Sequence, residues 1–322
     1  MRVVPLLAYL GLAVTLFVRN GIPLAGDRLV AWLVGALLCI SIAAGSNRWR
    51  TLLRDWLPLA VALTAYNVLT GIGGGRVPIH SEPPIWVAEH LFGVVPSVWL
   101  QQHLWNPSHI AWYDYASFAV YMSFFLATPV VLAVLWLQRP DRFRRYVRLL
   151  IGLWACALVF FTLSPTVPPW LASAKGMIGP VTRIVAPIGL HVPIFDPAVL
   201  WERGVRLAND LAAFPSLHEA MTLLIAIFFW PTARRPVRVL LALYPLAMAF
   251  TLIYTGEHYV TDLVGGALLT VLVVMVEARV AELRSARGAA RADREHRGRA
   301  RALGADDQPA VRAGLAHDRV RP

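Results

Sequence analysis

The chain has 322 residues, of which 57% are hydrophobic and 15% are charged, and its formal net charge is +11. Ordinary soluble domains contain about 25% charged residues, so this composition excludes a soluble globular domain. Together with the apolar runs that recur along the chain, it predicts an integral membrane protein. We therefore expect the protein to interact with a lipid bilayer, and we expect no binding of nucleic acid. The two cysteines, Cys39 and Cys156, lie inside apolar runs, so no disulfide framework is indicated.

The apolar runs predict an all-α fold, a polytopic membrane helix bundle with about eight transmembrane helices. Their approximate limits are residues 3–19, 29–45, 56–72, 111–137, 149–165, 213–230, 239–255 and 262–280. Several are close to the lower limit of about 17 residues for crossing a bilayer. The first run lacks a small-residue cleavage site and seven more runs follow it, so we interpret it as a membrane helix rather than a cleaved signal peptide.

The basic residues predict how these helices are oriented. With the N-terminus in the cytoplasm, 23 of the 30 Arg and Lys residues fall on the cytoplasmic side and 7 fall outside. Without the residues from Arg279 onward the ratio is still 12 to 7, and an excess of basic residues is typical of cytoplasmic loops. We expect an integral plasma membrane protein with both termini in the cytoplasm.

Three segments outside the predicted spans have a distinct character. The outer segment 73–110 is too interrupted by Pro to span, and the Trp and His spacing of 81–105 predicts a helix that lies in the membrane interface. The segment 166–212 is also outside. The tail 281–322 is rich in Arg and Ala and has no apolar face, so we expect a basic, solvated cytoplasmic tail that is disordered or weakly helical.

Two polar clusters fall at the outer ends of predicted spans. The stretch "AFPSLHEAMTLL" begins as a small-residue turn at Pro215 and Ser216 and then becomes an apolar helix that opens with His218. The stretch "YTGEHYVTD" contains His258 and Asp262, whose four-residue spacing places them on one helical face. A carboxylate there can hold one imidazole nitrogen and leave the other free to react. Because spans six and seven form a hairpin, both histidines reach the same depth, where ionisable groups indicate function.

A third polar site is "FTLSPTVPPWLASAKG", at the outer end of span five. Pro168 and its neighbours end the helix, and Trp170 can lie in the interface. The alternative interpretation of this stretch is a plain helix stop with an aromatic anchor. Cations are scarce on the outer side, so Arg183, Arg203 and Arg206 are candidates for contacting phosphate, either of a substrate or of lipid headgroups.

These residues resemble the type 2 phosphatidic acid phosphatase superfamily. "AFPSLHEA", followed 40 residues later by the His of "GEHYVTD", is similar to the inositol phosphorylceramide synthase-like branch, in which Pro-Ser-Leu-His replaces Pro-Ser-Gly-His. The Pro-Pro-Trp at residues 168–170 and the stretches "WYDYASFAVYMSFF" and "ALYPLAMAFTLIYTGEHY" also resemble that branch. The similarity covers about residues 105–280. It implies an N-terminal region at 1–104, a catalytic membrane domain with a six-helix-type core at 105–280, and a tail at 281–322.

The resemblance implies a role for each matching residue. His258 corresponds to the nucleophile that forms a phosphohistidine, Asp262 to the carboxylate that orients it, and His218 to the acid that protonates the leaving oxygen. Ser216 corresponds to a phosphate contact, and Pro168 and Trp170 to the substrate-binding turn. The chemistry needs neither a metal nor another cofactor, because cations and N–H groups can stabilise the phosphate charge. The implied function is a lipid phosphotransferase that acts on a lipid substrate, with transfer of inositol phosphate from phosphatidylinositol favoured.

Two departures from the superfamily pattern concern the phosphate-binding cations. Ordinary members have Lys, six residues, then Arg-Pro, whereas Lys175 and Arg183 are separated by seven residues and Ile184 follows. Ordinary members also have Arg six residues before the nucleophilic His, where this chain has Leu252. Fewer cations suit a phosphodiester, with one negative charge, better than a monoester.

Several other functions remain open at this point. A lipid phosphate phosphatase would use the same phosphohistidine step with water as acceptor. His218, His258 and Asp262 could bind a metal as a facial triad, whereas "HEAMT" has Thr222 where a zinc-peptidase motif needs its second His. A transporter with a histidine relay predicts polar residues at mid-membrane rather than at helix ends. The sequence does not indicate an oligomeric state.

Overall fold

The computed structural model describes residues 4–20, 26–43, 49–73, 81–192 and 211–306. The regular elements in this part of the chain are helices, and no named strand occurs there. Their bounds are α1 Val4–Asn20, α2 Gly26–Ala43, α3 Trp49–Gly73, α4 Glu82–Phe92, α5 Pro96–Leu104, α6 Trp112–Gln138, α7 Pro140–Leu163, α8 Pro169–Ala174, α9 Val185–Leu190, α11 Leu217–Phe229, the short 3₁₀ helix η1 Trp230–Thr232, α12 Arg235–Tyr254 and α13 Val260–Asp306. The all-α membrane fold expected from the sequence is confirmed.

Each predicted span corresponds to one helix, although the helices differ in length and in how well they suit a bilayer. Four of the described helices are long and apolar enough to cross one, namely α6, α7, α12 and the segment Val260–Arg291 of α13. Shorter apolar segments lie in α1, α2 and α11–η1, at Leu7–Leu16, Val30–Ile42 and Leu217–Thr232. The total of eight crossings therefore stays a prediction.

The surface of the long helices is apolar. Leu240, Leu243 and Leu246 on α12 and Leu268 and Leu272 on α13 are each more than half exposed. Soluble proteins rarely expose such rows of large apolar side chains. The helices therefore turn apolar side chains outward as well as inward, as helices in contact with lipid do.

The core of the bundle lies between α6, α9, α12 and the start of α13. α12 packs against α5, α6 and α11, and α7 packs against α3, α6 and α11. The buried side chains of one apolar cluster come from four helices and from the residue that precedes α9: Phe118, Tyr121, Ile184, Val185, Ile188, Met248, Leu252, Tyr254 and Leu263. This cluster brings the start of α6, the end of α12 and the start of α13 together at one end of the bundle.

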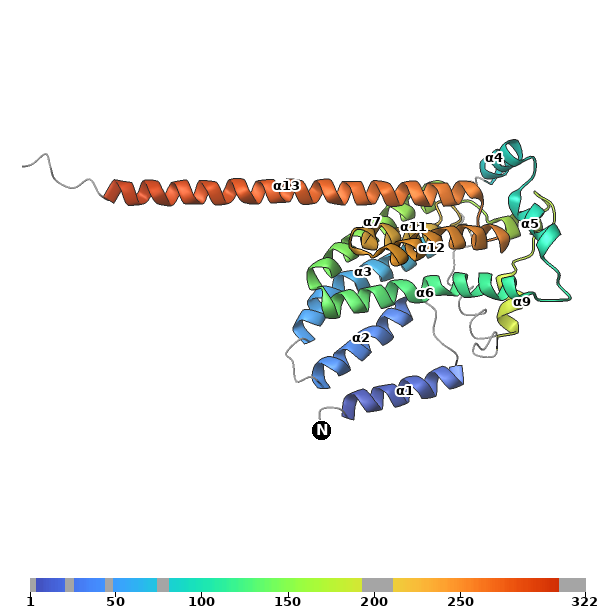
Figure 1. The fold of residues 1–322 in the computed structure, drawn as a ribbon, viewed down its shortest axis with the longest axis horizontal. Helices are drawn as coiled ribbons and strands as arrows, with labels where there is room; N and C mark the ends of the chain where they lie inside the picture. Colours follow the sequence, from blue (N-terminus) through green and yellow to red (C-terminus); the bar gives the residue numbers. More distant parts are fainter. Residues whose placement is uncertain (1–3, 21–25, 44–48, 74–80, 193–210, 307–322) are drawn as a thin grey trace, which may run out of the picture. The chain divides into compact units, whose positions relative to one another are not determined.

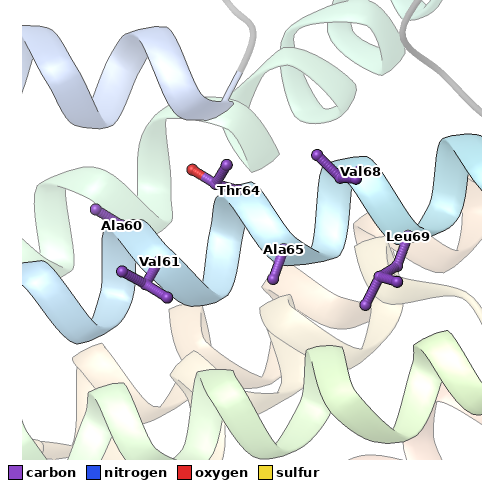
Figure 2. Close-up of a pocket in the computed structure, with 6 residues that line it drawn as sticks. All are labelled: Ala60, Val61, Thr64, Ala65, Val68 and Leu69. Carbon is purple, nitrogen blue, oxygen red and sulfur yellow. The ribbon is translucent and has the colours of Figure 1, made fainter.

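The N-terminal helices α1, α2 and α3 pack in chain order, and α3 also packs on α7. The buried Asp55 on α3 lies 3.5 Å from the Arg144 guanidinium on α7, and Trp56 packs against Phe143 beside it. Figure 2 shows a surface hollow along α3 that is lined by Ala60, Val61, Thr64, Ala65, Val68 and Leu69. Since this lining has no titratable group, we do not assign catalysis to it.

The segment predicted to lie in the interface forms two helices rather than one. α4 ends at Gly93, which has a left-handed φ of 74°, and α5 begins at Pro96. Each buries one face and exposes a tryptophan on the other, Trp86 on α4 and Trp99 on α5. α4, α5 and α9 gather at the same end of the long helices in Figure 1.

The C-terminal helix extends further than expected. Compact units are formed by Met1–Val273 and Val274–Pro322, and α13 runs through both as far as Asp306. The tail from residue 281 onward was expected to be disordered or weakly helical, and residues 281–306 form helix. The physical reason is composition, because Ala, Arg, Glu and Leu are strong helix formers even without an apolar face. Residues 307–322 lie outside the described part of the chain.

Candidate active site

The turn that leads into α11 is held by main-chain hydrogen bonds. The Thr166 amide donates to the Leu211 carbonyl at 2.8 Å, and the Ala213 amide donates to the Thr166 carbonyl at 3.2 Å. The buried Ser216 then caps α11, where its hydroxyl accepts from the Glu219 amide at 3.3 Å. A Ser cap is ordinary at a helix start, and it fixes the direction in which the first turn of α11 leaves the loop.

One face of α13 contacts this first turn of α11. The Asp262 carbonyl accepts from the Ser216 amide at 2.9 Å, and the Thr270 hydroxyl donates to the Ala220 carbonyl at 3.0 Å. Between them, a Cβ atom on Gly266 would lie 2.3 Å from the Ser216 carbonyl oxygen. Asp262, Gly266 and Thr270 are four residues apart and share a helix face. Glycine at position 266 therefore permits the close approach that joins the two motifs.

His258 and Asp262 form the centre of the site. His258 Nδ1 lies 3.4 Å from Asp262 Oδ2, and the two side chains are 8% and 0% exposed. The same carboxylate oxygen accepts from the Tyr259 amide at 2.9 Å, so the start of α13 fixes the position of the carboxylate. Asp262 thus faces Nδ1, which leaves Nε2 as the nitrogen of His258 that can react.

His218 lies beside His258 and against an aromatic wall. The ring centroids of the two histidines are 5.6 Å apart. The His218 ring stacks on Tyr121 at 5.2 Å and contacts Phe124 at 4.1 Å, both from α6. Its Nε2 is buried without a hydrogen-bond partner among the described residues. Such an unsatisfied atom is unusual in a protein interior, and here it lies next to a second imidazole.

A partly buried ion pair adjoins the histidines. Arg183 donates to Glu257 in a bidentate arrangement, with Nε to Oε1 at 2.7 Å and Nη2 to Oε2 at 3.2 Å. The guanidinium carbon also lies 4.8 Å from the centre of the Trp170 ring, and the charge of Arg183 acts on His218. Glu257 directly precedes His258, so the pair is part of the same constellation.

The turn between α12 and α13 requires glycine. Gly256 has a φ of 76°, and a Cβ atom there would lie 2.6 Å from Val181. The Gly256 carbonyl accepts from the Trp170 amide at 3.0 Å. The turn therefore binds the start of α8 and lets the loop carrying Arg183 pass close by.

A glutamine that the sequence analysis did not select connects α5 to this region. The Gln101 side chain accepts from the Thr182 amide at 2.7 Å, and its amide donates to the carbonyls of Thr182 and Tyr254 at 2.8 Å each. Gln101 is 6% exposed. No local pattern distinguishes it from its exposed neighbour Gln102, because its three partners are 81 and 153 residues away in the chain.

A second contact that the sequence did not predict joins α6 to the end of α12. The Tyr254 hydroxyl donates to Asp114, which is fully buried and also accepts from the Ala111 amide at 2.7 Å. The only sequence sign of it is an acidic residue in the first turn of a very apolar helix.

The predicted site residues are therefore only partly brought together. Six of them gather at one end of the bundle: Ser216, His218, His258, Asp262, Arg183 and Trp170. The buried Pro168 directly precedes α8. Arg203 and Arg206 lie outside the described residues. Lys175 is exposed at the end of α8, and Leu252 is fully buried in the core. Among the described residues, no group of three or more His, Cys, Asp or Glu side chains could hold a metal ion.

A family model described as the PAP2 superfamily matches residues 83–276, more than half of the chain. The chain belongs to the PAP2 superfamily. Neither the curated proteins nor the solved structures contain a match to it. The PAP2 match includes α4 and α5, which lie before residue 105, where the resemblance noted from the motifs begins. Membership supports a lipid enzyme of the phosphatase or phosphotransferase type.

Proposed function

We propose that this PAP2 protein is a membrane-embedded lipid phosphotransferase that works through a phosphohistidine on His258. The observation that carries the proposal is the juxtaposition of His218 and His258, with centroids 5.6 Å apart, beside a buried Asp262 that faces only one nitrogen of His258. Two imidazoles with separate surroundings can act as nucleophile and as proton donor in one reaction.

In the first step, the lone pair of His258 Nε2 attacks phosphorus and the bond from phosphorus to the leaving oxygen breaks. His218 donates its proton to that oxygen, and Asp262 stabilises the positive charge on the His258 ring. In the second step, an acceptor hydroxyl attacks phosphorus, its proton passes to His218, and the nitrogen–phosphorus bond breaks. The 3.4 Å separation of His258 and Asp262 is long for a hydrogen bond, as catalytic contacts often are before substrate binds.

The lipid character of the substrate follows from where the site lies. His218 and His258 lie at the ends of apolar helices whose outer surfaces suit acyl chains. A headgroup can reach both histidines while its chains stay in the bilayer, which avoids the cost of about 0.8 kcal/mol for each CH₂ that leaves it. Trp170 in the first turn of α8 would contact the headgroup, together with Pro168 and Ser216, which precede α8 and α11.

A phosphodiester donor fits the charges of the site better than a monoester. Leu252 fills the core position where ordinary superfamily members carry Arg, and Arg183 is already paired with Glu257. These features, with the Pro-Ser-Leu-His motif, favour the inositol phosphorylceramide synthase-like branch and phosphatidylinositol as donor. The chemistry as proposed uses no metal, so activity should persist in the presence of a chelator such as EDTA.

The direct test is product partitioning. Purified protein is incubated with phosphatidylinositol labelled at phosphorus, with and without a lipid alcohol, and the products are separated. We expect a new labelled lipid that requires the alcohol. Release of water-soluble phosphate from phosphatidate, with no reaction of the diester, would contradict the transferase and identify a lipid phosphatase.

We also propose that the protein lies in the plasma membrane with its termini in the cytoplasm and the site on the outer side, because Arg residues are concentrated in the loops at the opposite end. An exposed cysteine at Ala174, in a chain without Cys39 and Cys156, should react with an impermeant thiol reagent in intact cells. A cysteine at Gly288 should react only after lysis. The reverse pattern would contradict this orientation.

A further inference from the structure

The buried pair of Arg183 and Glu257 has a consequence for substrate choice. We propose that Glu257 is a specificity-determining residue: by holding Arg183, it makes the site accept phosphodiesters, with one negative charge, in preference to phosphomonoesters. The inference rests on the proposed phosphoryl transfer and adds to it the residue that sets the charge of the substrate.

The pair is well formed and largely shielded from solvent. Its two hydrogen bonds measure 2.7 and 3.2 Å, and the side chains of Arg183 and Glu257 are 18% and 8% exposed. Separating such a pair without a new partner leaves a buried charge uncompensated, which is strongly unfavourable. A substrate phosphate must therefore compete with the Glu257 carboxylate for the Arg183 guanidinium.

The pair occupies the space next to the reacting groups. Glu257 is adjacent to His258 in the chain, the charge of Arg183 acts on His218, and both charges act on Tyr121, whose ring stacks on His218. The face of the guanidinium is turned to Trp170. A phosphate between the two histidines therefore experiences both charges of the pair.

The net charge of the pair determines which phosphate is favoured. Arg183 alone would present one positive charge, whereas the pair presents none. A phosphomonoester carries about −1.5 to −2 at neutral pH and a phosphodiester carries one negative charge. Because Glu257 neutralises Arg183, the guanidinium cannot offset the additional charge of the monoester, and Leu252 provides no second cation. Glu257 thus penalises the monoester more than the diester.

Glu257→Gln tests this inference, because the amide keeps the shape and removes the charge. The measurement is kcat/KM for phosphatidate relative to kcat/KM for phosphatidylinositol. We expect this ratio to rise by about tenfold, equivalent to about 1.4 kcal/mol. Glu257→Asp, which keeps the charge, should leave the ratio close to that of the wild type.

Two further variants separate charge selection from a general structural effect. In an Arg183→Met background, Glu257→Gln should change the ratio much less, since the carboxylate then no longer neutralises an arginine. Glu219→Gln is the matched control: Glu219 is equally buried at 7% exposed but is not the partner of Arg183, so the ratio should not change. Protection against thermal unfolding by inorganic phosphate and by dimethyl phosphate gives a readout that does not depend on turnover.

The outcomes distinguish the inference from the proposed function. One outcome is a wild type that prefers the diester while folded Glu257→Gln keeps the same kcat/KM ratio and the same order of protection by the two phosphates. That result would overturn the proposed role of Glu257 in substrate choice and leave the proposed transferase function intact. The proposed role of Glu257 is also overturned if Glu257→Gln changes the kcat/KM ratio equally with and without Arg183. A wild type that reacts only with the monoester contradicts both.

Discussion

The two sides of the candidate site are held in different ways. On the histidine side, α13 contacts the first turn of α11 through the main chain, with a hydrogen bond from Ser216 to the Asp262 carbonyl and a glycine at position 266. On the arginine side, Arg183 is held by the side chains of Glu257 and Trp170, and its loop is held by Gln101.

This difference separates chemistry from selection. Main-chain contacts and close helix packing have little freedom, so they suit the two groups that must meet phosphorus in one geometry. Side-chain contacts can change one residue at a time without moving a helix. We therefore expect substitutions on the histidine side to remove turnover, and substitutions on the arginine side to change which substrate is used and how well it binds.

The largest effect is expected for His258→Ala. Since it removes the attacking atom, turnover should fall by about 10⁴-fold or more, while size-exclusion chromatography in detergent shows folded protein. His90→Ala is the matched control, because His90 is exposed on α4 and its ring contacts Trp86. Near-normal turnover by His258→Ala would rule out phosphohistidine catalysis at this residue.

Asp262→Ala should have the next largest effect. It removes the group that orients His258 but keeps the nucleophile, so we expect a loss of about 10²- to 10⁴-fold in kcat, smaller than that of His258→Ala. The comparison requires kcat for both variants in one assay. A folded Asp262→Ala protein with unchanged kcat would contradict the orienting role.

Gly266→Ala tests the contact between α11 and α13. The added methyl group would meet the Ser216 carbonyl oxygen at 2.3 Å, and neither backbone can shift easily. We expect a destabilisation of about 1–3 kcal/mol, measured by thermal unfolding in detergent, together with reduced turnover. Gly288→Ala in the same helix has no atom within 4 Å of the new Cβ and should be neutral or stabilising. Equal melting temperatures for the two variants would contradict the close approach.

Gln101→Ala should have the smallest effect on kcat of these four. It leaves the Thr182 amide and two carbonyls without their buried partner, and each such loss is worth about 1–3 kcal/mol. The loop carrying Arg183 loosens, so we expect a severalfold rise in KM with a small change in kcat. Gln102→Ala, at the exposed neighbouring position, should match the wild type. A Gln101→Ala protein whose kcat falls and whose KM is unchanged would contradict the expectation that the arginine side of the site affects substrate binding rather than turnover.

The histidine side was largely predictable from the sequence because its residues belong to two short motifs. The spacing of His258 and Asp262 predicted their contact, although His258 lies in the turn before α13 rather than on a helix face. The Pro-Ser lead-in indicated a helix start near His218, and α11 begins at Leu217. The positions of the spans were also predictable, since length and hydropathy are local properties of the chain.

The arginine side was not predictable in the same way. Arg183 was one of three candidate cations, and only the fold shows that it meets Glu257, 74 residues later in the chain. Gln101 and Asp114 depend on partners even further away. The helical continuation of α13 to Asp306 was one of two expectations for the tail, because a segment with helix-forming residues but no apolar face can be either helical or disordered.

The central claim is that phosphorus is transferred to His258, and trapping the intermediate tests it most directly. Full-length protein is incubated with phosphatidylinositol labelled at phosphorus, without an alcohol acceptor, and is then denatured in alkali, in which phosphohistidine survives. We predict an acid-labile label on the peptide that contains His258, and no label in His258→Ala. Label on another residue, or full turnover with no labelled protein at any time, would contradict the account.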